Sequence, residues 1–291
     1  MDLDRQPDLK DHLSPATCHM QLATRWSIIS PTRRTQKMDI GRAFAYISED
    51  KEWTKKLLLG AVIGAIPIAN FAIFGYQIQV ARNVAAAIDR PEADLGSPLP
   101  DWNDFGRLLT DGLRFIAAFF IFMLPIFVLI GCMTGAMVML AAGQPEAFSA
   151  TSSAPPPPEF FALFGLMFAC VMPYSLLLYA VWPMFGIQIA RRGSVGSCLQ
   201  FAEMWRLVRT QPTDYLLIVL IFFGLYLGVS LVMLPVLIVV FIPCIGYFIY
   251  LGLTYGAIML VLMVTGHLQG QFIAADNRAQ SGNEMLEPVL E

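Results

Sequence analysis

The sequence predicts an all-α, polytopic helical membrane protein with four to five membrane-spanning segments. Hydrophobic residues make up 56% of its 291 residues, and charged residues make up only 14%. No charged residue occurs in four windows, which are residues 57–81, 115–145, 160–190 and 215–266. Uncharged apolar runs of about 18 residues or more are typical of bilayer spans. A soluble globular domain is therefore excluded.

The last window is long enough for two spans. A helix rises about 1.5 Å per residue and the hydrocarbon core is about 30 Å thick, so residues 215–266 would extend far beyond one crossing. The break is predicted in the sequence IPCIG at 242–246, because Pro243 lacks a backbone N–H and Gly246 tolerates unusual dihedral angles. The two spans that follow are residues 215–241 and 246–266.

The two middle windows predict one helix each. Residues 115–142 and 160–190 are too long for one upright crossing and too short for two, so each helix should tilt or bend. A proline inside a helix removes a backbone hydrogen bond and can kink it. The expected kink sites are Pro125, Pro173 and Pro183.

The first window, residues 57–81, allows two interpretations. Loops rich in Lys and Arg stay in the cytoplasm, and residues 82–114 and 191–214 each carry four such residues, whereas the loop between the two middle spans carries none. That alternation fails at the first window, which is basic on both sides. Either this segment crosses once and the amino terminus lies outside, or it is a re-entrant helical hairpin broken near Pro67 and Asn70.

An internal duplication predicts two parallel repeat units. The matching strings are IQVAR at 78–82 with IQIAR at 187–191, and MLPIFVLI at 123–130 with MLPVLIVV at 233–240. The separation from the arginine to the proline is 43 residues from Arg82 to Pro125 and 44 residues from Arg191 to Pro235. Each unit consists of a span, an arginine at its cytoplasmic end, a surface helix and a second span.

The surface helix of each unit is predicted to be amphipathic and to lie at the membrane interface. In LPDWNDFGRLLTDG, residues 99–112, Asp101 can cap the helix. Its apolar face is formed by Trp102, Phe105, Leu108 and Leu109. In SCLQFAEMWRLVRT, residues 197–210, the apolar face is formed by Phe201, Met204, Trp205 and Val208. Tryptophan on such a face is typical of the boundary between water and lipid.

The chain divides into three parts. Residues 1–37 are polar without helical periodicity and are expected to be a disordered N-terminal extension. Residues 38–275 form the helical membrane domain, and residues 276–291 are expected to be a disordered acidic tail. The apolar segments of the membrane domain are 57–81, 115–142, 160–190, 215–241 and 246–266.

Several short motifs carry a resemblance to a known family. They are FGYQIQVAR, the string LPDWNDFG, the pair Asp111 and Gly112, and the closing GHLQGQF. Together they resemble the prokaryotic multi-pass membrane proteins grouped as domain-of-unknown-function family 4013, over about Met38 to Ala275. The resemblance implies a helical integral membrane protein in the cell (plasma) membrane of a bacterium or archaeon, with no assigned chemistry.

The sequence lacks the patterns expected of an enzyme. Asp, Glu, Lys, Arg and His are absent from the apolar windows, and no HExxH, CxxC or GxSxG motif occurs. The net charge of −3 provides no basic field for nucleic acid. We therefore expect no catalytic residue, no cofactor and no metal site. The expected role is structural or accessory, and the expected partners are the lipid bilayer and either another membrane protein or a second copy of the chain.

The polar residues inside the apolar windows suggest a second function. Their simplest role is interhelical hydrogen bonding. A helix broken at Pro67 and Asn70 could instead line a path for a small solute, as discontinuous helices do in transporters. The residues assigned to that path are Pro67, Asn70, Gln77, Gln79 and Gln188. The alternative function is therefore a small-solute transporter or channel subunit.

Small residues at helical spacing predict where helices approach closely. The pairs are Gly60 with Gly64, Gly131 with Gly135, and Gly252 with Gly256. These glycines are expected to face neighbouring helices, within the chain or in another copy.

Overall fold

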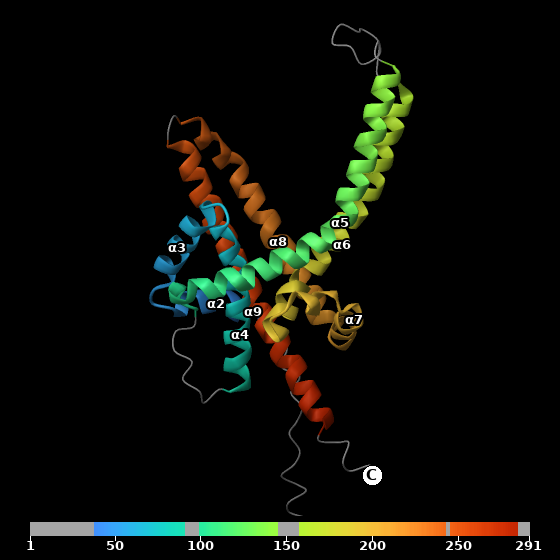
Figure 1. The fold of residues 1–291 in the computed structure, drawn as a ribbon. Helices are drawn as coiled ribbons and strands as arrows, with labels where there is room; N and C mark the ends of the chain where they lie inside the picture. Colours follow the sequence, from blue (N-terminus) through green and yellow to red (C-terminus); the bar gives the residue numbers. More distant parts are fainter. Residues whose placement is uncertain (1–37, 91–98, 145–156, 243–244, 285–291) are drawn as a thin grey trace, which may run out of the picture. The chain divides into compact units, whose positions relative to one another are not determined.

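A computed structural model describes residues 38–90, 99–144, 157–242 and 245–284, and every regular element in these ranges is a helix (Figure 1). Four of the described helical segments are long and apolar enough to cross a membrane. They are Trp102–Gly143, Pro158–Arg192, Pro212–Phe241 and Gly246–Ser281. The prediction of an all-α, polytopic membrane protein is confirmed.

The described ranges contain eight α-helices and four short 3-10 helices. The α-helices are α2 (Ile40–Glu49), α3 (Trp53–Ala65), α4 (Ala72–Asp89), α5 (Phe105–Gly143), α6 (Pro158–Arg192), α7 (Phe201–Thr210), α8 (Pro212–Val236) and α9 (Gly246–Glu284). The 3-10 helices are η1 (Ala69–Phe71), η2 (Trp102–Asp104), η3 (Val195–Leu199) and η4 (Leu237–Phe241).

The first apolar window folds as a helical hairpin against α9. Close contacts pair Gly60 with Met259, Gly64 with Tyr255, Gly266 with Gln77, and Gly270 with Val84. From Gly60 to Gly64 of α3 the contacted residue of α9 moves back from 259 to 255, so α3 runs antiparallel to α9. From Gln77 to Val84 of α4 it moves forward from 266 to 270, so α4 runs parallel to α9. The chain therefore reverses between α3 and α4. Residues 57–81 therefore form a helical hairpin and not a single continuous helix.

The turn of this hairpin contains a strained residue. Ile68 has φ of 71°, the one positive φ of a non-glycine residue in the described ranges. That conformation is unfavourable for a β-branched side chain. Pro67 precedes it, and the Asn70 N–H donates to the carbonyl of Ile66 at 3.0 Å. Lys56 and Arg82 each lie about ten residues from the turn, so both flanks lie at the same end of the hairpin.

The helices form two sets of opposite direction. The α6 carbonyls of Ile189 and Ala190 accept hydrogen bonds from Arg82 of α4, so the carboxyl ends of these two helices meet. The returning helices run the other way. Phe71, just before α4, and Gly75 of α4 face Gly112 and Leu108 of α5 in reverse order, and Tyr215 at the start of α8 donates to the carbonyl of Ala180 in α6. The segments α4 to α5 and α6 to α8 therefore have the same orientation, as parallel repeat units require.

The two predicted surface helices differ from each other in the structure. The first amphipathic segment is not a separate surface helix, because α5 begins at Phe105 and continues without a break to Gly143, with Pro125 inside it. Asp101 does not cap it; its carboxylate pairs with Lys56 instead, at 2.8 Å. In the second unit α7 is a separate short helix. It buries Met204 and Leu207, whereas Phe201 and Trp205, which we expected on the same face as Met204, are exposed.

The expected disordered tail is wrong for its first part. Helix α9 continues to Glu284, because a run of polar residues does not by itself end a helix. Residues 1–37, most of the loop 146–159 and residues 285–291 lie outside the described ranges.

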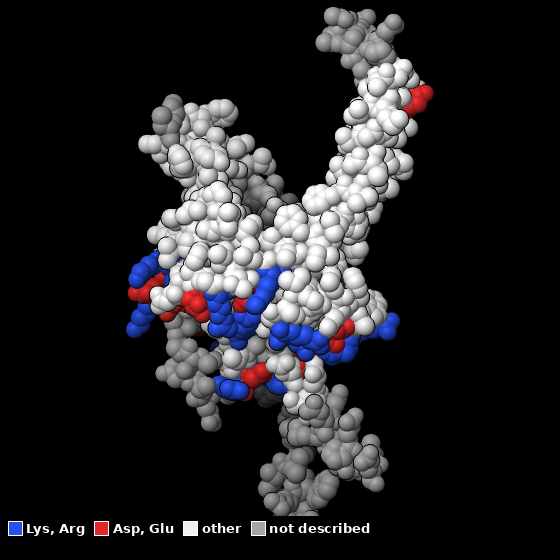
Figure 2. All heavy atoms as spheres, in the orientation of Figure 1, with Lys and Arg blue, Asp and Glu red and all other residues white. Residues whose placement is uncertain are grey.

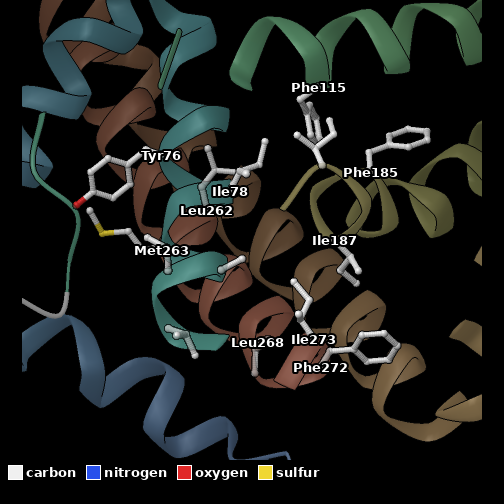
Figure 3. Close-up of a cluster of buried hydrophobic side chains, with 14 of the residues drawn as sticks. Tyr76, Ile78, Phe115, Phe185, Ile187, Leu262, Met263, Leu268, Phe272 and Ile273 are labelled. Carbon is white, nitrogen blue, oxygen red and sulfur yellow. The ribbon is translucent and has the colours of Figure 1, made fainter. Parts of the chain in front are cut away.

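The core lies where α4, α5, α6 and α9 meet. Its largest fully buried side chains include Tyr76, Phe115, Phe185 and Phe272, one from each of these helices (Figure 3). Figure 2 shows Lys and Arg gathered in one band over this part, whereas the helical arms beyond it carry almost no charged side chain. Buried packing is thus concentrated beside the charged band.

Candidate functional site

A buried glutamine cluster joins three helices in the core. The Gln77 side chain of α4 donates from Nε2 to Gln269 Oε1 of α9 at 3.0 Å. Gln269 in turn donates from Nε2 to the carbonyl of Pro183 in α6 at 2.8 Å. Gly186 leaves room for the amide, since a Cβ there would lie 2.7 Å from Nε2 of Gln269. Both glutamines have no exposed surface, and their hydrogen bonds hold α4, α6 and α9 together.

The other residues assigned to a solute path lie apart from this cluster. Gln188 is fully buried, and neither of its side-chain polar atoms has a partner in the described ranges. Gln79 donates to Asn83 on its own helix at 2.9 Å. At the hairpin turn Asn70 has a buried Oδ1 without a described partner, and Pro67 is exposed. Hydrogen bonds between described atoms join none of the five predicted path residues to another.

A buried carboxylate connects α4 to α5. Asp111 is 3% exposed and accepts from Arg82 and, at 2.8 Å, from Arg114. The Arg82 guanidinium also donates to the carbonyls of Ile189 at 3.0 Å and Ala190 at 3.1 Å. These carbonyls lie in the last turn of α6, where a cation is favoured by the helix dipole. Arg82 is therefore a fixed link between three helices.

A second buried carboxylate has the same role at the end of α9. Asp276 is 1% exposed and pairs with Arg191 at 2.9 Å and with Arg206 at 3.3 Å. Glu203 of α7 accepts from Arg206 at 2.8 Å and lies 3.4 Å from both Arg191 and Arg192. The hydrogen bond from Arg206 lowers the pKa of the Glu203 carboxyl. The network fixes α7 to α6 and α9.

A third buried ion-pair network joins the start of α3 to the segment that precedes α5. The Lys56 ammonium is 6% exposed and pairs with Asp50 at 2.9 Å and Asp101 at 2.8 Å. It also donates to the carbonyl of Leu99 at 2.8 Å, and Trp102 donates to the Lys56 carbonyl at 3.1 Å. Burial opposes the charge, but the hydrogen bonds to the two carboxylates outweigh it and raise the pKa of Lys56.

Two of the pockets between the described helices differ in their lining. The first, which we call the basic pocket, has a volume of about 630 Å³. It is lined by Arg82, Ala85, Ala86, Asp89, Arg90, Ala190, Arg191, Arg192, Ile273 and Asn277. The second, the apolar pocket, has a volume of about 290 Å³ and lies between α5, α6 and α8. It is lined by Phe119, Met123, Ile126, Ser175, Leu178, Tyr179, Trp182, Phe222 and Tyr226. Neither contains any of the five predicted path residues.

Sequence reasoning missed several of these residues. Gln269 and Asp276 lie beyond the last apolar window and were assigned no role. The signal for Gln269 was its position between Gly266 and Gly270, four residues apart, which places one helical face against α4. Arg82 and Arg191 occupy matching positions in the repeat, and the structure brings both into the basic pocket.

Groups suited to metal binding are absent from the described ranges, where no three His, Cys, Asp or Glu residues lie close enough to hold an ion. Cys132 and Cys170 are exposed and Cys198 is buried, and all three are free thiols. Burial raises the pKa of Cys198 to about 11, so its thiol stays protonated at neutral pH.

Comparison with known proteins gives one match. A family model described as "Protein of unknown function (DUF4013)" matches residues 58–240. No curated protein and no solved structure matches the chain. The matched region includes Asp111 and the four arginines of the basic pocket, and it ends before Gln269 and Asp276 of α9.

Proposed function

The chain belongs to the DUF4013 family of proteins of unknown function, and from this premise we propose that it is a non-enzymatic protein with a structural or accessory role in the plasma membrane. Its four apolar helices make it an integral membrane protein. The observation that carries the proposal is the use of its buried polar groups. Gln77, Gln269, Asp111 and Asp276 all bind neighbouring helices, which is the chemistry of a scaffold.

The distribution of charge supports one orientation in the membrane. The loops that carry four Lys and Arg residues each, 82–114 and 191–214, belong in the cytoplasm, and residues 146–159 belong outside. Helix α3 has 13 residues and would span about 20 Å, less than the hydrocarbon core. The α3–α4 hairpin therefore re-enters the cytoplasmic face, and α5 packs against its turn, where Gly112 lies next to the backbone of Phe71.

Cysteine labelling tests this orientation. Ser152→Cys should react with an impermeant maleimide added outside the cell, although Ser152 itself lies outside the described ranges. Asn103→Cys should not react. The exposed positions Lys55 and Ala87 flank the hairpin, so both cysteine variants should be protected as Asn103→Cys is. Labelling of Lys55→Cys and Ala87→Cys from opposite faces would disprove the hairpin.

A small-solute transporter or channel subunit is the second candidate. The observation that favours it is Gln188, a fully buried amide with no described partner in a helix that crosses the membrane. Asn70 at the strained turn has a similar unpaired oxygen. Unpaired polar groups of this kind are costly in a membrane unless water or a solute satisfies them.

A flux assay separates the two candidates. The full-length protein is reconstituted into liposomes and tested with a panel of small neutral and charged solutes. A structural role predicts the same permeability as empty liposomes. Flux that disappears in Gln188→Leu and Asn70→Leu, while both variants remain folded, would establish the transporter and overturn the structural role.

A further inference from the structure

We infer that the basic pocket is a binding site for a phosphate group. Four arginines line it, from the carboxyl-terminal parts of α4 and α6, and the third wall is α9. The inference goes beyond the proposed function, because a scaffold and a transporter could each carry such a site.

Two of the arginines are held rigidly in the wall. The side chain of Arg82 is 20% exposed, and that of Arg191 is 13% exposed. Arg82 uses three of its five N–H groups on Asp111, Ile189 and Ala190, which leaves two free. An anchored guanidinium loses little side-chain entropy when it binds an anion.

The other two arginines supply charge at the rim. Arg192 is 42% exposed, and Arg90 is exposed and forms no ion pair with any described residue. They come from two different helices, so they approach a ligand from two sides. A planar guanidinium presents paired N–H donors that match two oxygens of a phosphate.

The net charge of the lining is positive. Asp89 is the only carboxylate among the lining residues, and it accepts a hydrogen bond from Asn277 at 3.0 Å. The carboxylates that pair with the lining arginines are not lining residues: Asp111 and Asp276 are 3% and 1% exposed, and Glu203, 3.4 Å from both Arg191 and Arg192, is 18% exposed. An anion in the pocket therefore meets four guanidinium groups and one carboxylate.

The shape of the pocket also fits this ligand. Alanines at 85, 86 and 190 leave a space of about 630 Å³, enough for a phosphate with a small organic group. The pocket lies at the cytoplasmic ends of helices, where basic pockets bind lipid headgroups. A soluble phosphate compound offers the same chemistry, so the two sources must be separated by experiment.

The experiment uses the full-length protein in a neutral detergent. Binding of phosphatidylglycerol is titrated by native mass spectrometry, with phosphatidylcholine as the zwitterionic lipid, and binding of inorganic phosphate is measured by calorimetry. The test variant is Arg90→Gln with Arg192→Gln. The matched control is Lys55→Gln with Arg209→Gln, which removes two exposed cations outside the pocket.

The test variant should bind phosphatidylglycerol at least about tenfold more weakly, and the control should bind it as the wild-type chain does. If the test variant loses binding of phosphatidylglycerol and the wild-type chain does not bind inorganic phosphate, the site is a lipid site. If the wild-type chain binds inorganic phosphate and the test variant does not, the site takes a soluble phosphate compound. The single variant Arg90→Gln breaks no described ion pair, so it should fold as the wild-type chain does. It should show a smaller loss of phosphatidylglycerol binding, which keeps the inference testable if the double variant misfolds. Equal binding by wild type and both variants, or an equal loss in the control, would overturn the inference.

Discussion

Glycines show how the core differs from the helical arms. In the core an added Cβ at Gly75 would overlap the backbone of Leu108, and one at Gly112 would overlap the backbone of Phe71. In the arms, glycines have open space around them. These glycines are Gly131, Gly135, Gly165, Gly224, Gly228 and Gly252. The same small residue thus permits a helix crossing in one region and faces the surroundings in the other.

The two regions also treat apolar side chains differently. Phe115 and Phe185 have no exposed surface, whereas Met139 in α5 is 78% exposed and Phe241 in η4 is 83% exposed. In a bilayer, lipid tails cover such side chains, so the arms gain no hydrophobic stabilisation from further packing. The free energy of unfolding should therefore depend on the core and its ion pairs and hardly at all on the arms.

The largest effect is expected when Asp111 is removed. Asp111→Ala leaves the partly buried Arg82 guanidinium without its carboxylate and should destabilise the protein by about 3–5 kcal/mol. The free energy of unfolding can be measured by titration with SDS in mixed micelles. Asp104→Ala, at an exposed position nearby, should change it by less than about 0.5 kcal/mol. Similar values for the two variants would contradict the structural role of Asp111.

The next effect concerns the crossing of α4 and α5. Gly112→Ala forces the two backbones apart and should cost about 3 kcal/mol, because no flexible side chain can move to make room. Gly131→Ala on the same helix should be neutral or stabilise by up to about 1 kcal/mol, since alanine favours helix and no neighbour is displaced. The same unfolding titration gives both values. A large loss at Gly131 would mean that another molecule packs there.

Two buried glutamines of the core should differ in how much they contribute to stability. Gln269→Leu removes the partner of Gln77 and should cost about 2 kcal/mol. Gln188→Leu replaces an amide that has no described partner and should be neutral or stabilising. Unfolding titrations of the two single variants are the measurement. Equal destabilisation would show that Gln188 also binds a neighbour.

A smaller effect is expected at the hairpin turn. Asn70→Leu should cost about 1 kcal/mol at most, because the Asn70 side-chain oxygen accepts no hydrogen bond from a described residue. Membrane insertion, followed by protease protection, should be unchanged. A loss of insertion would indicate that the amide is needed to form the turn.

The smallest effect follows from the pKa of Glu203. Arg206 lowers this pKa in the folded protein, so the pair contributes stability above the unfolded value of about 4.3. That contribution is lost as the pH falls below about 4.3 through the lowered folded value. Glu203→Gln should therefore flatten the acid side of the stability curve slightly. An unchanged curve would mean that the Glu203–Arg206 pair contributes nothing to the free energy of unfolding.

The spans were predictable because charged residues mark the limits of apolar windows. The ends of α5 and α9 were not, since both helices continue through charged residues such as Arg114 and Asp276. The reversal at Pro67 and Ile68 was one of two interpretations. The contacts of α3 and α4 with α9 select it, and these contacts join residues that are far apart in the sequence.

The candidate site was predictable only in part. Gln77 and Gln188 were identified because an amide within an apolar window is conspicuous. Their different surroundings were not predictable, because they depend on which helix lies opposite. Arg82 and Asp111 are 29 residues apart, and the carbonyls of Ile189 and Ala190 that also bind Arg82 lie more than 100 residues after it. No local pattern encodes such a pairing.

The contact between the hairpin and α9 has a consequence for synthesis. The hydrogen bond from Gln77 to Gln269 joins residues 192 apart. At about 5–20 residues per second, roughly 10–40 s pass between the translation of the first and the second. During that time the faces of α3 and α4 that pack against α9 in the folded protein have no partner helix. The α3–α4 hairpin is therefore translated early but is among the last parts of the core to complete its packing.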